Sequence, residues 1–300
     1  MIDTKMLKTI PLGSRKNLVA LKDLLPLAHN SGFKHDDLNI LAGKIVDAQR
    51  QKRKCVVMMG AHLIKVGMSC YIIDLVRKGF ISHLVMNGAG PIHDFELALI
   101  GATSEDVKTN LEDATFGMAD ETGRYLNLAA REGYKKRIGY GKSLGMLIGN
   151  LNCPNKDISI LYNAHKYSIP VSVFTAIGTE IIYQHPDADG AALGGASFID
   201  FHALVHTLTG LEGGVIVNIG SAVICPEAFL KALTMARNMG YTVQKFTSAN
   251  LDMIDHYRPR VNVLYRPTSQ GGLALNIIAR HEETIPALYH RIINNKDEGL

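Results

Sequence analysis

The sequence predicts an α/β protein built on a doubly wound, mainly parallel sheet with helices on both faces. Short apolar blocks alternate along the chain with segments of helical period, which is the pattern of βα units. Loops rich in glycine and polar residues follow four of these blocks. The chain has 300 residues, 47% of them hydrophobic and 20% charged, and this composition excludes the disordered and disulfide-stapled classes of protein.

The strands are predicted from the apolar blocks. Continuous blocks of this kind are typical of parallel strands that are covered on both faces. The blocks are residues 55–59, 83–86, 171–174, 215–218, 241–246, 261–265 and 273–278.

The helices are predicted from the periodic segments between the blocks. They cover residues 68–78, 158–167, 226–238 and 282–292. Proline and glycine support two of these boundaries, because Pro226 suits the first turn of a helix and Gly240 follows a helix as a C-cap does.

The chain is expected to form one domain with two additions. Residues 114–150 have helical periodicity without a strand-like block, so we expect a helical insertion between the second and third strands. Residues 1–53 are expected to form an N-terminal helical arm, and residues 54–300 a single nucleotide-binding α/β domain. No proline- or serine-rich linker divides the chain.

The charge pattern argues against nucleic acid as a partner. The 32 Lys and Arg residues exceed the 28 Asp and Glu residues by only four, and they are dispersed. The one basic cluster, residues 49–54, is interpreted as the solvated end of a helix.

The cysteines and the N-terminus indicate the compartment. The four cysteines are widely spaced and form no CxxC pair, so neither a zinc site nor a disulfide framework is expected. The N-terminus has scattered charges and no signal-type apolar run, and no apolar run reaches the roughly 18 residues that a membrane span needs. We therefore expect a cytoplasmic protein without a membrane partner.

The loops after the strands are the predicted ligand site. Ligands of open parallel sheets bind beyond the carboxyl ends of the strands. Four loops there, residues 60–67, 87–94, 175–180 and 219–222, combine glycine with polar side chains. Glycine lets the backbone approach a ligand, and the N–H groups at helix starts bind anions, so the set predicts a nucleotide or dinucleotide. Any single loop could instead use glycine for packing.

Diagnostic catalytic motifs are absent from the sequence. It contains no GxGxxG, GxxxxGK[ST], GxSxG or HExxH motif. His202 and His206, with Asp200 nearby, have the spacing of metal ligands, but two histidines at a partly polar helix seam are commoner, and we predict no metal site. His93 and Asp94 follow the second strand, where an acid/base pair would be useful, although Asp94 could equally cap a helix.

Several ordered blocks resemble the deoxyhypusine synthase family. They are the run from the Gly60 loop through the second strand, the helix and IPV turn of residues 157–174, the loop of residues 175–185, and the polar pairs Gly220–Ser221 and Thr247–Ser248. The similarity covers about residues 54–278. It implies the family's NAD-binding fold, a homotetramer with sites between subunits, and NAD-dependent oxidation of spermidine with transfer of an aminobutyl fragment.

The resemblance also implies roles for individual residues. The family has amine-binding glutamates where this chain has His93 and Asp94, so we expect these two residues to be catalytic acid/base groups or to bind the amine. Glu180 and His185 are expected to bind the amine substrate, for which a carboxylate is a suitable partner. Ala176 replaces an acidic residue of the family. The expected NAD-binding residues are Ala61, His62, Gly67, Asn87, Gly88, Ala89, Gly220, Ser221, Thr247 and Ser248.

One departure from the family concerns its covalent chemistry. Family enzymes use a lysine next to tryptophan to form an imine, whereas this chain has no tryptophan and has no lysine between Lys245 and Lys296. The corresponding stretch carries arginine, which supplies no neutral amine. Lys65 could substitute in principle, although a phosphate contact or a solvated side chain is more expected.

Two functions follow from this combination. The first is an NAD-dependent transferase of the deoxyhypusine synthase type that acts on an amine or polyamine without the usual lysine imine. The alternative is a non-catalytic nucleotide-binding or regulatory module of the same fold. A metal-dependent hydrolase or transferase at His93 and Asp94 is a third, less favoured possibility.

Overall fold

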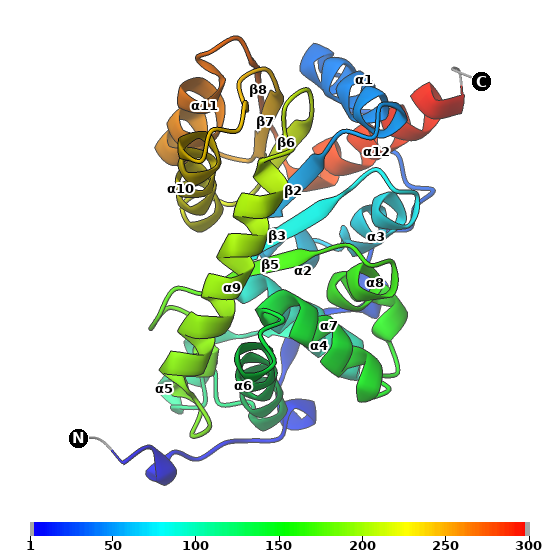
Figure 1. The fold of residues 1–300 in the computed structure, drawn as a ribbon. Coiled ribbons are helices and arrows are strands. Elements are labelled where there is room, and N and C mark those ends of the chain that lie inside the picture. The colour runs from blue at the N-terminus through cyan, green and yellow to red at the C-terminus, as the bar shows by residue number, and fades with distance from the viewer. Residues whose placement is uncertain (1–2, 298–300) are drawn as a thin grey trace.

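A six-stranded parallel sheet forms the centre of the molecule, and it confirms the predicted α/β fold class. The computed structural model describes residues 3–297. The strand order is β5-β3-β2-β6-β7-β8, and all neighbouring strands are parallel (Figure 1). The strands are β2 (Cys55–Met59), β3 (His83–Asn87), β5 (Val171–Phe174), β6 (Val215–Ile219), β7 (Thr247–Asp252) and β8 (Leu273–Ile278).

The strand order creates a switch point in the middle of the sheet. From β2 the chain proceeds outward to β3 and β5, and it then returns to the other side of β2 to form β6, β7 and β8. The loops that leave β2 and β6 therefore diverge at the carboxyl edge, which is where open α/β sheets bind ligands.

Helices cover both faces of the sheet, because its strands are apolar on both sides. Val57 and Met59 point into one core cluster, whereas Val56 and Met58 point into the other, as the alternation of a strand requires. The first face is covered mainly by α1 (Asp36–Arg50), α3 (Ser69–Arg77), α8 (Ile160–Lys166) and α12 (His281–Asp297). The second face is covered mainly by α9 (Gly190–Leu208) and α10 (Ile224–Asn238).

Two of the predicted strands are wrong. Residues 241–246 are irregular, and the strand begins only at Thr247. Strand β7 (TSANLD) was missed because it is polar, although every residue in it is buried. Residues 261–265 belong to a π-helical segment, Pro259–Tyr265, which continues into the short α11 (Arg266–Thr268). A short apolar run alone does not separate a strand from a buried helix.

Residues 88–150 lie at one end of the molecule, in the lower half of Figure 1. They form α4 (Ala89–Ile100), β4 (Ala102–Glu105), α5 (Val107–Glu112), α6 (Asp120–Lys135) and α7 (Tyr140–Asn150). The stretch predicted as a helical insertion thus contains α6 and α7.

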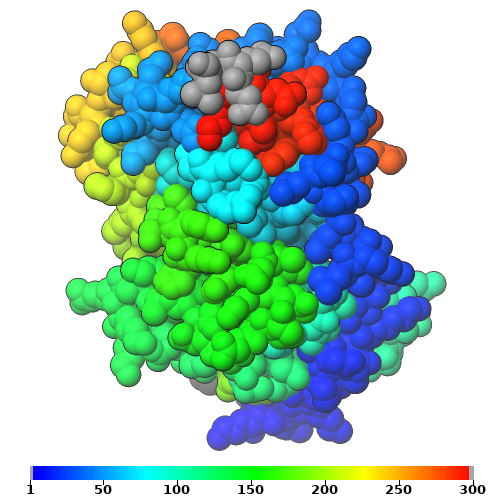
Figure 2. All heavy atoms as spheres, turned by 90° about the vertical axis from the view of Figure 1, so that its right-hand side faces the viewer, coloured from blue at the N-terminus to red at the C-terminus, as the bar shows by residue number. Residues whose placement is uncertain are grey.

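The N-terminal segment runs along one side of the molecule (Figure 2). Within the described part of residues 1–53, α-helix is confined to α1, and the rest consists of 3-10 turns, irregular chain and strand β1 (Asn17–Ala20). Strand β1 pairs antiparallel with β4. No helix within residues 3–297 is long and apolar enough to cross a bilayer.

Candidate functional site

A pocket of about 490 Å³ opens beside the carboxyl edge of the sheet. Segments that follow three neighbouring strands contribute to it: Lys65 ends the short helix α2 (His62–Lys65) after β2, Ala89 and His93 belong to α4 after β3, and Glu180 lies in the loop after β5. The strand β4 and the N-terminal segment complete the wall, the latter through Arg15. Polar residues from distant parts of the chain therefore meet here, as expected for the carboxyl ends of parallel strands.

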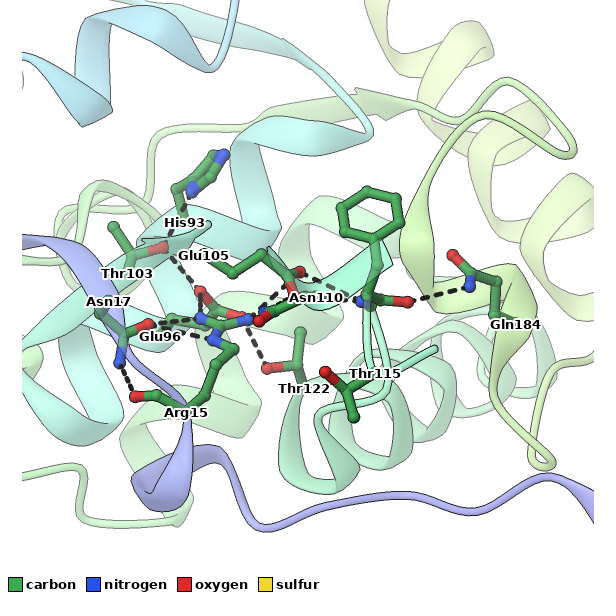
Figure 3. A network of polar contacts seen from close by, with 12 residues as sticks. Arg15, Asn17, His93, Glu96, Thr103, Glu105, Asn110, Thr115, Thr122 and Gln184 are labelled. Carbon is green, nitrogen blue, oxygen red and sulfur yellow. Dashed lines mark hydrogen bonds and ion pairs between the residues drawn. The ribbon is translucent and has the colours of Figure 1, made fainter. Parts of the chain in front are cut away.

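A buried ion pair forms the floor of this pocket. Arg15 Nη2 lies 2.6 Å from Glu96 Oε2, and the two side chains are 3% and 1% exposed. Arg15 Nη1 lies 3.6 Å from Glu105 Oε1, and Asn17 Oδ1 accepts from Arg15 Nη2 at 2.7 Å (Figure 3). Because removal of one partner would leave a charge buried without compensation, this pair fixes the N-terminal segment against α4 and β4.

Hydroxyl groups connect the ion pair to His93. The carboxylate of Glu96 accepts from Thr103 Oγ1 at 2.6 Å and from Thr122 Oγ1 at 2.8 Å. Thr103 Oγ1 in turn lies 2.8 Å from His93 Nδ1. The other ring nitrogen of His93, Nε2, points away from the network (Figure 3) and makes no hydrogen bond within residues 3–297.

His93 is neutral at physiological pH in this environment. Burial lowers the pKa of His93 to about 4, and the positive charges of Lys65 and Arg15 act in the same direction. The imidazole thus keeps one nitrogen available as a hydrogen-bond acceptor.

Glu180 is the other predicted site residue in the pocket. It is 8% exposed, and its carboxylate accepts from the backbone N–H of Ala176 at 3.1 and 3.2 Å. A Cβ atom on Gly88 would lie 2.3 Å from Glu180 Oε1, so glycine is needed where the carboxylate packs against the start of α4. Burial raises the pKa of Glu180, which makes a cationic ligand a favourable partner for it.

The structure places Asp94 outside the pocket. Its carboxylate accepts from Ser159 Oγ at 2.5 Å and from the N–H groups of Ile160 and Leu161 at 2.7 and 3.1 Å. Asp94 therefore caps the start of α8, and burial raises its pKa to about 6. This placement argues against the catalytic role predicted for Asp94 and favours the capping alternative, although the helix that it caps lies much further along the chain.

His185 also lies away from the pocket. It is 5% exposed, its Nδ1 accepts from the N–H of Asp187 at 3.1 Å, and its ring packs on Gly123 of α6. It does not line the pocket that holds Glu180, so the structure does not bring the two predicted substrate-binding residues together.

The switch point holds a second polar region. A Cβ atom on Gly60 would lie 2.2 Å from the backbone oxygen of Gly220, and one on Gly220 would lie 2.5 Å from His281 Nε2. The loops that leave β2 and β6 are in close contact because both carry glycine there. The predicted residues Ala61, His62 and Ser221 belong to these two loops, and the His62 ring lies 5.7 Å from that of His281.

Buried polar atoms in and around this region lack partners. Three atoms on neighbouring strands and at the start of α12 make no hydrogen bond among the described residues: Asn218 Oδ1, Asp252 Oδ2 and His281 Nδ1. Because buried polar groups are normally satisfied, these atoms indicate a region suited to the hydroxyl and amide groups of a nucleotide.

The remaining predicted cofactor residues are divided between several places. Asn87 Oδ1 accepts from the N–H of Gly90 at 3.2 Å and so caps α4, whose first residue, Ala89, lines the pocket. Gly67 has a φ of +79°, and its Cα packs against the backbone of Asp23 and Leu24 in the N-terminal segment.

Thr247 and Ser248 lie at the amino ends of the strands, opposite the carboxyl edge that holds the pocket. They are the first residues of β7, not the residues that follow a strand, and Ser248 Oγ donates to the oxygen of Val263 at 2.6 Å. Their predicted position depended on the wrong strand at residues 241–246. This pair therefore lies away from the other predicted cofactor residues, which follow the carboxyl ends of strands.

Sequence reasoning missed several residues of the pocket. Glu96 could have been found, because it lies one helical turn after His93. Arg15 and Thr103 carried no local signal, since the first belongs to an irregular segment and the second to β4, a strand that the sequence pattern did not reveal.

No protein-family model matches the chain, and no curated protein sequence matches it. Solved structures do share its fold. A protein from Methanococcus maripaludis S2 assigned as LOR/SDH superimposes with a TM-score of 0.58 at 14% identity, over 91% of this chain and 72% of the other. AgrE, in a ternary complex with ornithine and NAD+, gives 0.51 at 13% identity over 87% of this chain, which spans only 33% of AgrE.

A third structure connects the fold to the family that the sequence resembles. A protein from Entamoeba histolytica assigned as a deoxyhypusine synthase superimposes with a TM-score of 0.51 at 10% identity, over 88% of this chain and 90% of the other. The shared property is the fold. The chain thus has the α/β fold of the deoxyhypusine synthase-like proteins.

Proposed function

We propose that the protein is an NAD-dependent enzyme that acts on a small cationic amine in the pocket beside His93. The observation that carries the proposal is the presence in one pocket of a neutral imidazole with a free Nε2 and a buried carboxylate, Glu180. An amine substrate needs both groups, because its positive charge needs a counter-charge and the N–H of its reacting neutral amine needs an acceptor.

NAD is the cofactor that the switch point suits. AgrE, a protein of the same fold, binds NAD+. The close contact of Gly60 with Gly220 and the unpartnered atoms of Asp252 and His281 fit a nucleotide with many hydroxyl and amide groups. When bound, NAD supplies an acceptor for hydride. The residues of the β2 and β6 loops would hold it.

The chain's own residues bind the amine in this proposal. His93 Nε2 accepts a hydrogen bond from the substrate amine in its neutral form, which is the form that can be oxidised, and Glu180 binds positive charge elsewhere on the substrate. The pocket also contains Lys65, which makes no ion pair among the described residues.

The absence of lysine between residues 245 and 296 favours a second candidate, a nucleotide-binding module without turnover.

Two measurements test the proposal. We expect calorimetry to show NAD binding, and we expect absorbance of reduced cofactor to rise with at least one member of a panel of diamines, polyamines and basic amino acids. Glu180→Gln should raise KM for the amine about 10-fold or more while NAD affinity stays unchanged. Glu132→Gln, on the exposed side of α6, is the matched control and should leave both values unchanged.

The outcomes separate the candidates. No NAD binding at millimolar concentration would overturn the proposal. If NAD binds but no amine reduces it to NADH, the result would support the non-catalytic module instead.

A further inference from the structure

We propose that Thr103 and Glu96 are positioning residues that hold His93 as the tautomer with hydrogen on Nδ1, so that Nε2 is the hydrogen-bond acceptor of the pocket. The inference deepens the proposed function, on which it rests for the role of the imidazole in catalysis. The tautomer itself is a property of the protein alone and can be measured without substrate or cofactor.

The hydrogen bonds around Thr103 allow one arrangement of protons. A threonine hydroxyl has a single hydrogen to donate. Thr103 Oγ1 lies 2.6 Å from Glu96 Oε2 and 2.8 Å from His93 Nδ1, so it contacts two possible acceptors. If its hydrogen is donated to Glu96, the oxygen is free to accept from His93, and the hydrogen of that second bond must then be on Nδ1.

The opposite arrangement is unfavourable. If Thr103 donated to His93 Nδ1, its oxygen would face a carboxylate oxygen at 2.6 Å with no hydrogen between them. The same carboxylate oxygen also accepts from Arg15 Nη2 at 2.6 Å, so it acts as an acceptor toward both neighbours. Thr122 donates to the other oxygen of Glu96 at 2.8 Å, so both carboxylate oxygens accept hydrogen bonds.

Burial makes this arrangement rigid. Thr103 and Thr122 are completely buried, and Glu96 is 1% exposed, so water does not compete for these bonds. The result is a carboxylate, a hydroxyl and an imidazole in series, with the carboxylate acting through Thr103. The series keeps Nε2 unprotonated and directed into the pocket, where it can accept a hydrogen bond from the substrate.

Nitrogen NMR tests the tautomer directly. Protein labelled with ¹⁵N-histidine should give, for His93, an Nδ1 shift of the protonated type and an Nε2 shift of the unprotonated type at pH 7. The signals are assigned by their loss in His93→Gln. An Nε2–H tautomer in the unmodified protein would overturn the inference at once, whether or not any variant folds.

Three variants test the cause. Thr103→Val removes the hydroxyl at nearly constant shape, and we expect His93 to lose its single tautomer. Thr103→Ser keeps the hydroxyl and should keep the tautomer. Thr122→Val is the matched control, because it removes the other buried hydroxyl on Glu96 without touching His93, and the His93 signals should stay in place. An unchanged tautomer in Thr103→Val would show that Thr103 does not set it.

Kinetics then connect the tautomer to catalysis. With an amine that the enzyme oxidises, Thr103→Val should lower kcat about 10-fold or more with little change in KM, and Thr103→Ser should restore it. A changed tautomer with an unchanged kcat would reject the role in catalysis. Because the NMR result does not depend on NAD or substrate, failure of the proposed function and failure of this inference are distinguishable.

Discussion

Two glycines at the switch point set how closely the β2 and β6 loops approach each other. Gly60 and Gly220 belong to loops that the sequence identified as ligand-binding, but their mutual contact could not be predicted, because it depends on the adjacency of β2 and β6. The same limit applies to the pocket. His93 and Glu180 were found from their positions after strands, whereas Arg15 and Thr103 join them only through tertiary packing.

The contact between these glycines leads to a prediction at the level of one residue. In Gly60→Ala the new Cβ would lie 2.2 Å from a backbone oxygen, so the loops must separate. We expect a loss of about 1–3 kcal/mol in the free energy of unfolding, and weaker NAD binding by calorimetry. Gly43→Ala, in helix α1 with no atom within 4 Å of the new Cβ, should be neutral or stabilising by up to about 1 kcal/mol. Equal effects of the two substitutions would contradict the prediction.

At the scale of elements, prediction from sequence succeeded where hydrophobicity determines structure. Strands β2, β3, β5, β6 and β8 coincide with apolar blocks. Strand β7 does not, because it is stabilised by side-chain amides: Asn250 Nδ2 donates to Asn276 Oδ1 at 3.0 Å, and its Oδ1 accepts from Asn218 at 2.9 Å. A ladder of asparagines across three neighbouring strands cannot be recognised until their pairing is known.

Helix α8 depends on a cap supplied by another helix. Asp94→Ala would leave the N–H groups of Ile160 and Leu161 without their acceptor in a buried place, so we expect urea unfolding at pH 7 to show a loss of about 1–3 kcal/mol. Asp189→Ala removes a less buried N-cap, on α9, and should cost about 1 kcal/mol. Should Asp94→Ala instead keep full stability and lose turnover, the catalytic role first predicted for Asp94 would be restored.

At the scale of the whole molecule, buried titratable groups make stability depend on pH in two opposing ways. Burial lowers the pKa of His83 to about 3, with Lys54 acting in the same direction, so the folded protein resists a proton that the unfolded chain binds below about pH 6.5. Burial raises the pKa of Asp200 to about 7, so the folded protein retains a proton there that the unfolded chain has lost above about pH 4.

Substitution of His83 isolates its contribution to the pH dependence of stability from that of Asp200. His83 is held between the hydroxyls of Thr207 and Ser172 at 2.7 and 2.9 Å. Its contribution to stability should be fully present above pH 6.5 and should fall by up to about 1.4 kcal/mol per pH unit as the pH drops toward 3. The free energy of unfolding of the wild type minus that of His83→Gln should therefore shrink over this range. A difference that stays constant with pH would contradict the assignment.

The homotetramer and the polyamine substrate stay predictions of the sequence resemblance, and the cytoplasmic location stays a prediction from the cysteines and the N-terminus. Light scattering of the purified protein would test the first of them.

The ion pair between Arg15 and Glu96 has a consequence for the time course of folding. The two residues are 81 positions apart and Arg15 lies in an irregular segment, so their contact can form only after α4 has packed and presents Glu96 to it. Arg15 should therefore dock late, and refolding chains should pass through a species with a complete sheet and an unfinished pocket. Amine oxidation would then recover more slowly than far-UV circular dichroism, so a freshly refolded sample could have native secondary structure before it is active.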